Sequence, residues 1–249
     1  MAKRKKSFQV NYSRLMAFVV LIVACVVVLF MVGGQNKLKN VEVLATNGEI
    51  TNQQKDEIIR ASTLKMGAQI DSLSDIENNI REGVNTTGYA RFENAERISN
   101  GTVRLTISLR RPVAVVAAGG NYIVIDNEGM VMQVHSQMPN ENVLYVTGAD
   151  VSNYSKGKTL VTRKESQLGD IIRIASAIQA EGVSNTYSEL NVKDLKDMYL
   201  VTNTSAIVEI FDGKNIEQSL RMVEEIIKSG GLKGKITISG DYAGYRREE

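Results

Sequence analysis

The chain has 249 residues, of which 43% are apolar, 30 are basic and 28 are acidic, giving a net charge of +2. This apolar content is enough for packed cores and excludes a largely disordered chain. With one Cys, one His and no Trp, neither a disulfide framework nor a zinc site is expected. Five basic residues lie among the first 34, which leaves 25 basic against 28 acidic residues afterwards and argues against a nucleic-acid partner.

Residues 15–32 form an uninterrupted apolar run without a charge, Pro, Asn or Gln. With Gly33 and Gly34 the run would rise about 30 Å as a helix, and the residues before it are basic, as is typical of a cytoplasmic flank. We therefore expect a cytoplasmic tail over residues 1–14, a transmembrane helix over residues 15–34 and extracytoplasmic domains after it. A cleaved signal peptide is the alternative, because Val32-Gly33-Gly34 would serve as a cleavage site.

The next part of the chain predicts two helices packed on a small sheet, in the order β-α-α-β-β. The predicted elements are a strand over 39–45, helices over 51–61 and 75–82, and strands over 89–98 and 102–109. Capping boxes, Thr51 with Gln54 and Ser74 with Glu77, open the two helices, and Gly83 ends the second. Ser-Asn-Gly joins the two last strands as a hairpin, and the second of them alternates apolar and polar residues.

After Pro112 the pattern changes to short strands with two interspersed helices. The predicted elements are strands over 113–118, 122–126, 130–134 and 142–147, a helix to residue 181, strands near 187–193, 197–203 and 206–211, a helix from 216 to 230, and a strand over 235–239. Thr162 and Glu165 form the capping box of the first of these helices. The fold class is therefore α+β.

A search for catalytic motifs finds only weak candidates. Ser-x-x-Lys occurs at Ser62/Lys65 and at Ser155/Lys158, the spacing of penicillin-binding enzymes, but their Ser-Asp-Asn and Lys-Thr-Gly companion motifs are missing. Residues 126–129 resemble a calcium loop less than a plain hairpin turn. His135 follows a strand and suggests an exposed loop residue. We therefore expect no catalytic, cofactor-binding or metal-binding residues, and no cofactor.

The positive signal is a strand that could accept a partner strand at a sheet edge. In residues 235–239, Ile236 and Ile238 alternate with polar residues, and Tyr242 and Tyr245 follow in the tail as amphipathic anchors. These four residues are the tentative partner-binding site. An ordinary edge strand with a frayed tail is the alternative.

Three local sequences then resemble the bacterial FtsQ/DivIB family of cell-division proteins. They are VRLTISLRRPVA at residues 103–114, Ile125-Asp126-x-x-Gly129, and LYVTG at residues 144–148, in the family's order and spacing. The resemblance covers nearly the whole chain. It implies a POTRA domain over residues 35–111, a β domain over 112–240 and a C-terminal tail over 241–249.

The resemblance also implies a function. Such proteins are non-enzymatic scaffolds at the division septum that bind the small partners FtsB/DivIC and FtsL and help regulate septal peptidoglycan synthesis. In the family, the last strand of the β domain and the following segment contact the FtsB/DivIC-type partner, which corresponds here to residues 235–245.

Two other functional classes stay open on the sequence. POTRA domains also occur in membrane assembly and transport modules, although usually as repeats that lead into a barrel or channel. A membrane-anchored cell-wall enzyme is the second alternative, and it would depend on Ser62 or Ser155.

Overall fold

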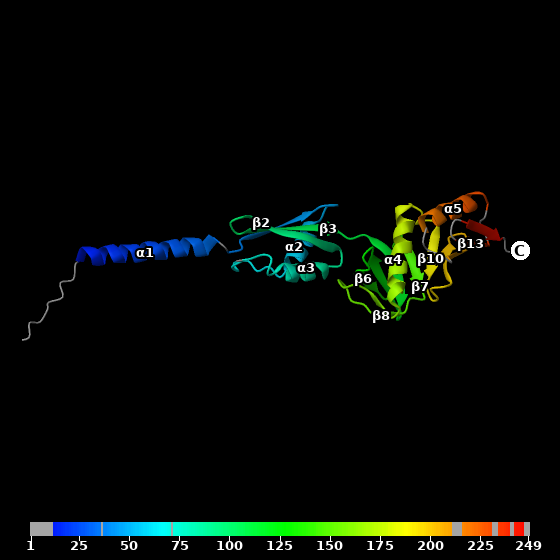
Figure 1. Ribbon diagram of the computed structural model, residues 1–249, viewed down its shortest axis with the longest axis horizontal. Coiled ribbons are helices and arrows are strands. Elements are labelled where there is room, and N and C mark those ends of the chain that lie inside the picture. The colour runs from blue at the N-terminus through cyan, green and yellow to red at the C-terminus, as the bar shows by residue number, and fades with distance from the viewer. Residues whose placement is uncertain are drawn as a thin grey trace, which may run out of the picture.

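The computed structural model describes residues 12–35, 37–70, 72–210, 216–230, 234–239 and 242–246. Helix α1 lies at one end of an elongated molecule and the C-terminal strands lie at the other end (Figure 1). Between them are an N-terminal unit (residues 37–109) and a C-terminal unit (residues 112–246). Most of the predicted basic tail, residues 1–11, lies outside the described residues.

Helix α1 spans Tyr12–Gln35. Its side chains are described over residues 16–27, where Phe18 and Leu21 are 62% and 60% exposed. Within the part of the chain that the structure describes, no helix is both long enough and apolar enough to cross a membrane. The predicted transmembrane helix over residues 15–34 is therefore contradicted.

The N-terminal unit has the predicted order of elements. They are β1 (Asn40–Ala45), α2 (Asn52–Ala61), α3 (Glu77–Asn85), β2 (Ala90–Ser99) and β3 (Thr102–Leu109). The central strand β3 pairs with β1 in parallel and with β2 in antiparallel orientation. The apolar residues of the alternating strand β3, Val103, Leu105 and Ile107, are at most 1% exposed and pack against α2 and α3.

The two helices of this unit begin in different ways. The capping box at α2 is confirmed, because the Thr51 hydroxyl accepts the Gln54 N–H and the Gln54 side chain accepts the Thr51 N–H. The capping box predicted for α3 is wrong: the helix begins at Glu77 without a side-chain cap, and the Ser74 hydroxyl bonds to Ser72 at 2.6 Å. The helix also continues through Gly83 to Asn85.

The C-terminal unit is built on a nine-stranded sheet with the order β14-β13-β12-β11-β10-β7-β4-β5-β6. Its strands are β4 (Pro112–Ala118), β5 (Asn121–Asp126), β6 (Val131–His135), β7 (Leu144–Thr147), β10 (Tyr187–Asn191), β11 (Met198–Thr202), β12 (Ile207–Ile210), β13 (Lys235–Ser239) and β14 (Tyr242–Arg246). Two short strands, β8 (Val151–Asn153) and β9 (Val161–Thr162), pair separately. The chain is thus α+β, with mixed sheets.

Helices α4 (Glu165–Ala180) and α5 (Ile216–Lys228) lie side by side and bury one face of this sheet (Figure 1). Ile174 of α4 and Leu220 of α5 are fully buried among the strand residues of that face. The predicted capping box at Thr162 is wrong, because Thr162 belongs to β9 and its hydroxyl donates to the Lys164 carbonyl oxygen at 2.8 Å.

Gly83 lies where α3 approaches the end of α2. A Cβ atom on Gly83 would lie 1.9 Å from the Ala61 carbonyl oxygen, whereas a Cβ on Gly169, within α4, would meet no atom within 4 Å. We predict that Gly83→Ala destabilises the protein by about 2 kcal/mol or more through this clash. The matched change Gly169→Ala should stabilise it by about 0.5–1 kcal/mol, because Ala is the better helix former. Urea unfolding followed by circular dichroism measures both, and a neutral Gly83→Ala would contradict the close approach.

Candidate functional site

The structure separates the four predicted partner-binding residues. Ile236 and Ile238 are 0% exposed and belong to the core beneath α4 and α5. They are therefore core residues, and a partner could not contact them without opening the fold. Tyr245 lies on β14 and is 40% exposed. Tyr242 is the first residue of β14, and its side chain lies outside the described part of the chain.

The predicted edge strand is not the edge. Strand β13 pairs in parallel with β12 and in antiparallel orientation with β14, so it is the second strand of the sheet. The edge is instead β14, in the segment predicted as a polar tail. Sequence reasoning missed this strand because Gly244 weakens the strand pattern. The signal was Gly240-Asp241, a dipeptide typical of a two-residue hairpin loop, and the backbone of Ser239 pairs with that of Tyr242.

The register shows which main-chain groups of β14 face outward. The Ile207 N–H donates to the Gly234 carbonyl oxygen at 2.9 Å, so the backbone groups of Gly234 point toward β12. Backbone groups alternate in direction along a strand, so those of Ile236 point toward β12 as well. Lys235 and Thr237 consequently face β14. Their partners there are Arg246 and Gly244, whereas Ala243 and Tyr245 lie opposite Ile238 and Ile236. The N–H and C=O groups of Ala243 and Tyr245 therefore point away from the sheet.

A shallow hollow of about 310 Å³ lies beside this edge. Its lining residues are Glu209, Lys235, Thr237, Gly244, Tyr245 and Arg246. Lys235 forms an ion pair with Glu209, and the Thr237 hydroxyl lies 3.5 Å from a Glu209 carboxylate oxygen. Charged and polar groups thus border the outward-facing backbone of β14, an arrangement that suits a partner strand whose side chains are partly polar.

The helix-free side of the sheet continues from this hollow as a cross-strand row. The row takes one residue from each of five neighbouring strands, β13, β12, β11, β10 and β7. In that order they are Lys235, Ile207, Val201, Glu189 and Tyr145. Ile207 is 37% exposed, and the others are half-buried. Burial raises the pKa of Tyr145, and the nearby Tyr122 and Glu189 raise it further, so its phenol stays neutral and able to donate a hydrogen bond.

The opposite edge of the sheet is covered. Strand β6 ends the sheet there, but the Val131 N–H donates to the Lys158 carbonyl oxygen and the Val131 carbonyl oxygen accepts the Gly157 N–H, at 2.9 and 2.8 Å. The loop that contains residues 157–160 thus occupies the start of this edge. Between the two ends of the nine-stranded sheet, β14 is the more open to strand addition.

The candidates for catalysis lie in the two Ser-x-x-Lys segments and at the end of β6. Ser62 is fully buried, and its hydroxyl donates to the Ile59 carbonyl oxygen at 2.7 Å, just after α2. Ser155 and Lys158 share a turn in which the Lys158 N–H donates to the Ser155 carbonyl oxygen. His135 is the last residue of β6, half-buried, and its ring contacts the Gln133 side chain.

The calcium-like segment 126–129 is a hairpin turn, as predicted. The Gly129 N–H donates to the Asp126 carbonyl oxygen at 3.0 Å. Among the described residues, no group of three or more His, Cys, Asp or Glu side chains is arranged to hold a metal ion.

Comparison with known proteins gives no relative from which a function could be assigned. No protein-family model matches the chain, and no curated protein matches its sequence. The resemblance to the FtsQ/DivIB family therefore remains an expectation from the sequence.

The different surroundings of Ile238 and Tyr245 predict different costs of truncation. Ile238→Ala should lower the free energy of unfolding by about 2–5 kcal/mol, because it leaves a cavity in the core. Tyr245→Ala should cost about 1 kcal/mol or less, because its ring is half-exposed at an edge. Urea unfolding measures both changes. Equal costs would mean that β13 does not lie beneath the helices as described.

Proposed function

We propose that this protein is a non-enzymatic scaffold of the bacterial cell-division machinery that holds a partner protein at the β14 edge. The observation that carries the proposal is an edge strand at the end of the molecule with outward-facing main-chain groups at Ala243. The resemblance of the chain to the FtsQ/DivIB family supports it. On this proposal the partners are FtsB/DivIC-like and FtsL-like proteins, and the protein acts at the division septum on septal peptidoglycan synthesis.

Strand addition explains how such a site could bind without a deep pocket. An added strand would hydrogen-bond to the outward N–H and C=O groups of Ala243 in β14, which supplies affinity that depends little on sequence. Specificity would come from side chains on the two faces: Tyr245 on the helix side, and Arg246 and Lys235 beside the hollow. A partner strand with an acidic residue facing Arg246 and an apolar residue beside Tyr245 would fit this edge best.

A proline in β14 tests this proposal by removing a single main-chain N–H group from the edge. Ala243→Pro removes an outward-facing N–H but leaves the pairs with β13 that involve Gly244 and Arg246 intact. We predict that it abolishes binding of a DivIC-like partner, measured by isothermal titration calorimetry, with less than about 1 kcal/mol lost in stability. Ala243→Ser is the matched control, since it keeps the N–H and should bind as the unaltered protein does.

The cellular part of the proposal has its own test. Depletion of the protein should give filamentous cells without septa, and the unaltered protein should restore division whereas the Ala243→Pro variant should not. Normal division of depleted cells, together with failure of a DivIC-like protein to co-purify, would contradict the scaffold function. Turnover of peptidoglycan precursors that is lost on Ser155→Ala would favour the enzyme instead.

A further inference from the structure

Two residues, Arg110 and Arg111, connect the two units of the molecule. Strand β3 of the N-terminal unit ends at Leu109 and strand β4 of the C-terminal unit begins at Pro112. Two units joined by a short link are free to rotate unless contacts between them prevent it. The side chain of Arg110 is only 3% exposed, although an arginine at a linker would ordinarily extend into water.

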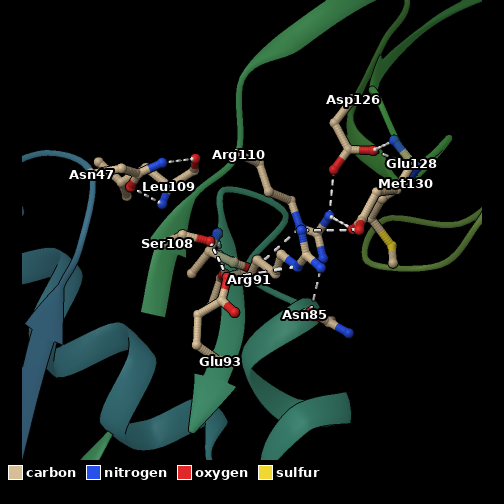
Figure 2. Close-up of polar contacts among 12 residues, drawn as sticks. Asn47, Asn85, Arg91, Glu93, Ser108, Leu109, Arg110, Asp126, Glu128 and Met130 are labelled. Atoms are coloured by element: carbon tan, nitrogen blue, oxygen red, sulfur yellow. Dashed lines mark hydrogen bonds and ion pairs between the residues drawn. The ribbon is translucent and has the colours of Figure 1, made fainter. Parts of the chain in front are cut away.

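The Arg110 guanidinium bonds to both units (Figure 2). On the N-terminal unit it donates to the Asn85 amide oxygen at 3.2 Å and to the Ala90 carbonyl oxygen at 3.4 Å. On the C-terminal unit it donates to the carboxylates of Asp126 and Glu128, the latter at 3.0 Å. Each of its three nitrogens therefore has an acceptor, and the acceptors come from three separate segments.

The Asp126 carboxylate is held in place by hydrogen bonds within its own turn, independently of Arg110. Its side chain is 2% exposed, and one carboxylate oxygen accepts the N–H groups of Glu128 and Met130 at 2.9 and 2.8 Å. The other oxygen accepts from Arg110 (Figure 2). The β5–β6 turn thus fixes the carboxylate, so the arginine docks onto a rigid acceptor rather than a mobile side chain.

The main chains of the two units also touch at two places near Arg110. A Cβ atom on Gly88 of the N-terminal unit would clash with the Met132 carbonyl oxygen of the C-terminal unit. A Cβ atom on Gly157 of the C-terminal unit would lie 2.5 Å from the Asn85 carbonyl oxygen, so the two main chains touch there. On either side of this contact the units are separated by hollows of about 310 and 650 Å³. If the central contact were released, these hollows would leave room for one unit to tilt against the other.

We propose that Arg110 is a positioning residue that holds the two units in one fixed orientation through its buried contacts with Asn85, Ala90 and Asp126. The exposed ion pair between Arg91 and Glu128 adds to the junction, but its side chains are 48% and 38% exposed. Surface pairs of this kind contribute little and are screened by salt. Among the side-chain contacts across the junction, Arg110 is therefore the one that we expect to set the orientation, whether or not a partner is bound to the β14 edge.

Distances between spin labels on the two units test this proposal. The labels go on Gln53→Cys in α2 and Gln218→Cys in α5, both exposed, in a full-length Cys25→Ser background. Double electron–electron resonance should give one narrow distance distribution for this protein. With Arg110→Met the distribution should broaden at least twofold, while circular dichroism shows that both units remain folded.

Two further variants keep the test decisive. Arg104→Met is the matched control, because Arg104 pairs with Glu42 and Glu96 inside the N-terminal unit, and it should leave the distribution narrow. If Arg110→Met fails to fold, Arg110→Lys replaces it: lysine keeps the charge but cannot reach acceptors on both units, so broadening is again expected.

Two outcomes would overturn the proposal. One is an unchanged, narrow distribution in a folded Arg110→Met or Arg110→Lys variant. The other is broadening of the distribution in the label-bearing protein with Arg110 intact when sodium chloride is raised to about 1 M, because salt screens exposed pairs far more than buried ones. That result would assign the orientation to Arg91 and Glu128.

Discussion

The parallel pairing of β13 with β12 is the constraint on which the candidate site depends. It places Ile207 opposite Lys235, which turns Ile236 and Ile238 toward the helices and Lys235 and Thr237 toward the open face. A shift of one residue would reverse both faces, exposing two isoleucines and burying a lysine. The core thus fixes the register of β13, and the register in turn decides which backbone groups of β14 face outward.

Local periodicity carried much of the fold prediction. The alternation in β3 and the apolar stripe of α5 both arise because one face of the element is buried. Each pattern can be recognised from a short stretch of sequence, without knowledge of distant residues. The helix caps were less predictable. Ser74 and Thr162 have the residue types of a capping box, but one bonds to Ser72 and the other joins a strand. A capping box needs the correct backbone conformation as well as the correct residues, and tertiary pairing sets that conformation.

The candidate site was less predictable than the fold for the same reason. The alternation of Ile236 and Ile238 is equally consistent with an edge strand and with an inner one, because both bury a single face. Only the order of strands in the sheet distinguishes them, and that order depends on partners distant in sequence. The turn at Asp126 was predictable from its four residues, whereas its ion pair with Arg110 joins two units and is visible only in three dimensions.

On the proposed function the protein would act by position rather than by chemistry, so the rigidity of its frame would be part of that function. Strand β14 and helix α1 lie at opposite ends of the molecule (Figure 1), and the path between them passes through the two-residue link at Arg110. Removing one member of a buried ion pair is costly, whereas the intact pair adds little net stability, so such a pair serves orientation better than it serves folding. A partner strand added at β14 would then be held at a set distance and direction from the N-terminal unit, and freedom at the link would loosen that geometry even if every contact at the edge survived.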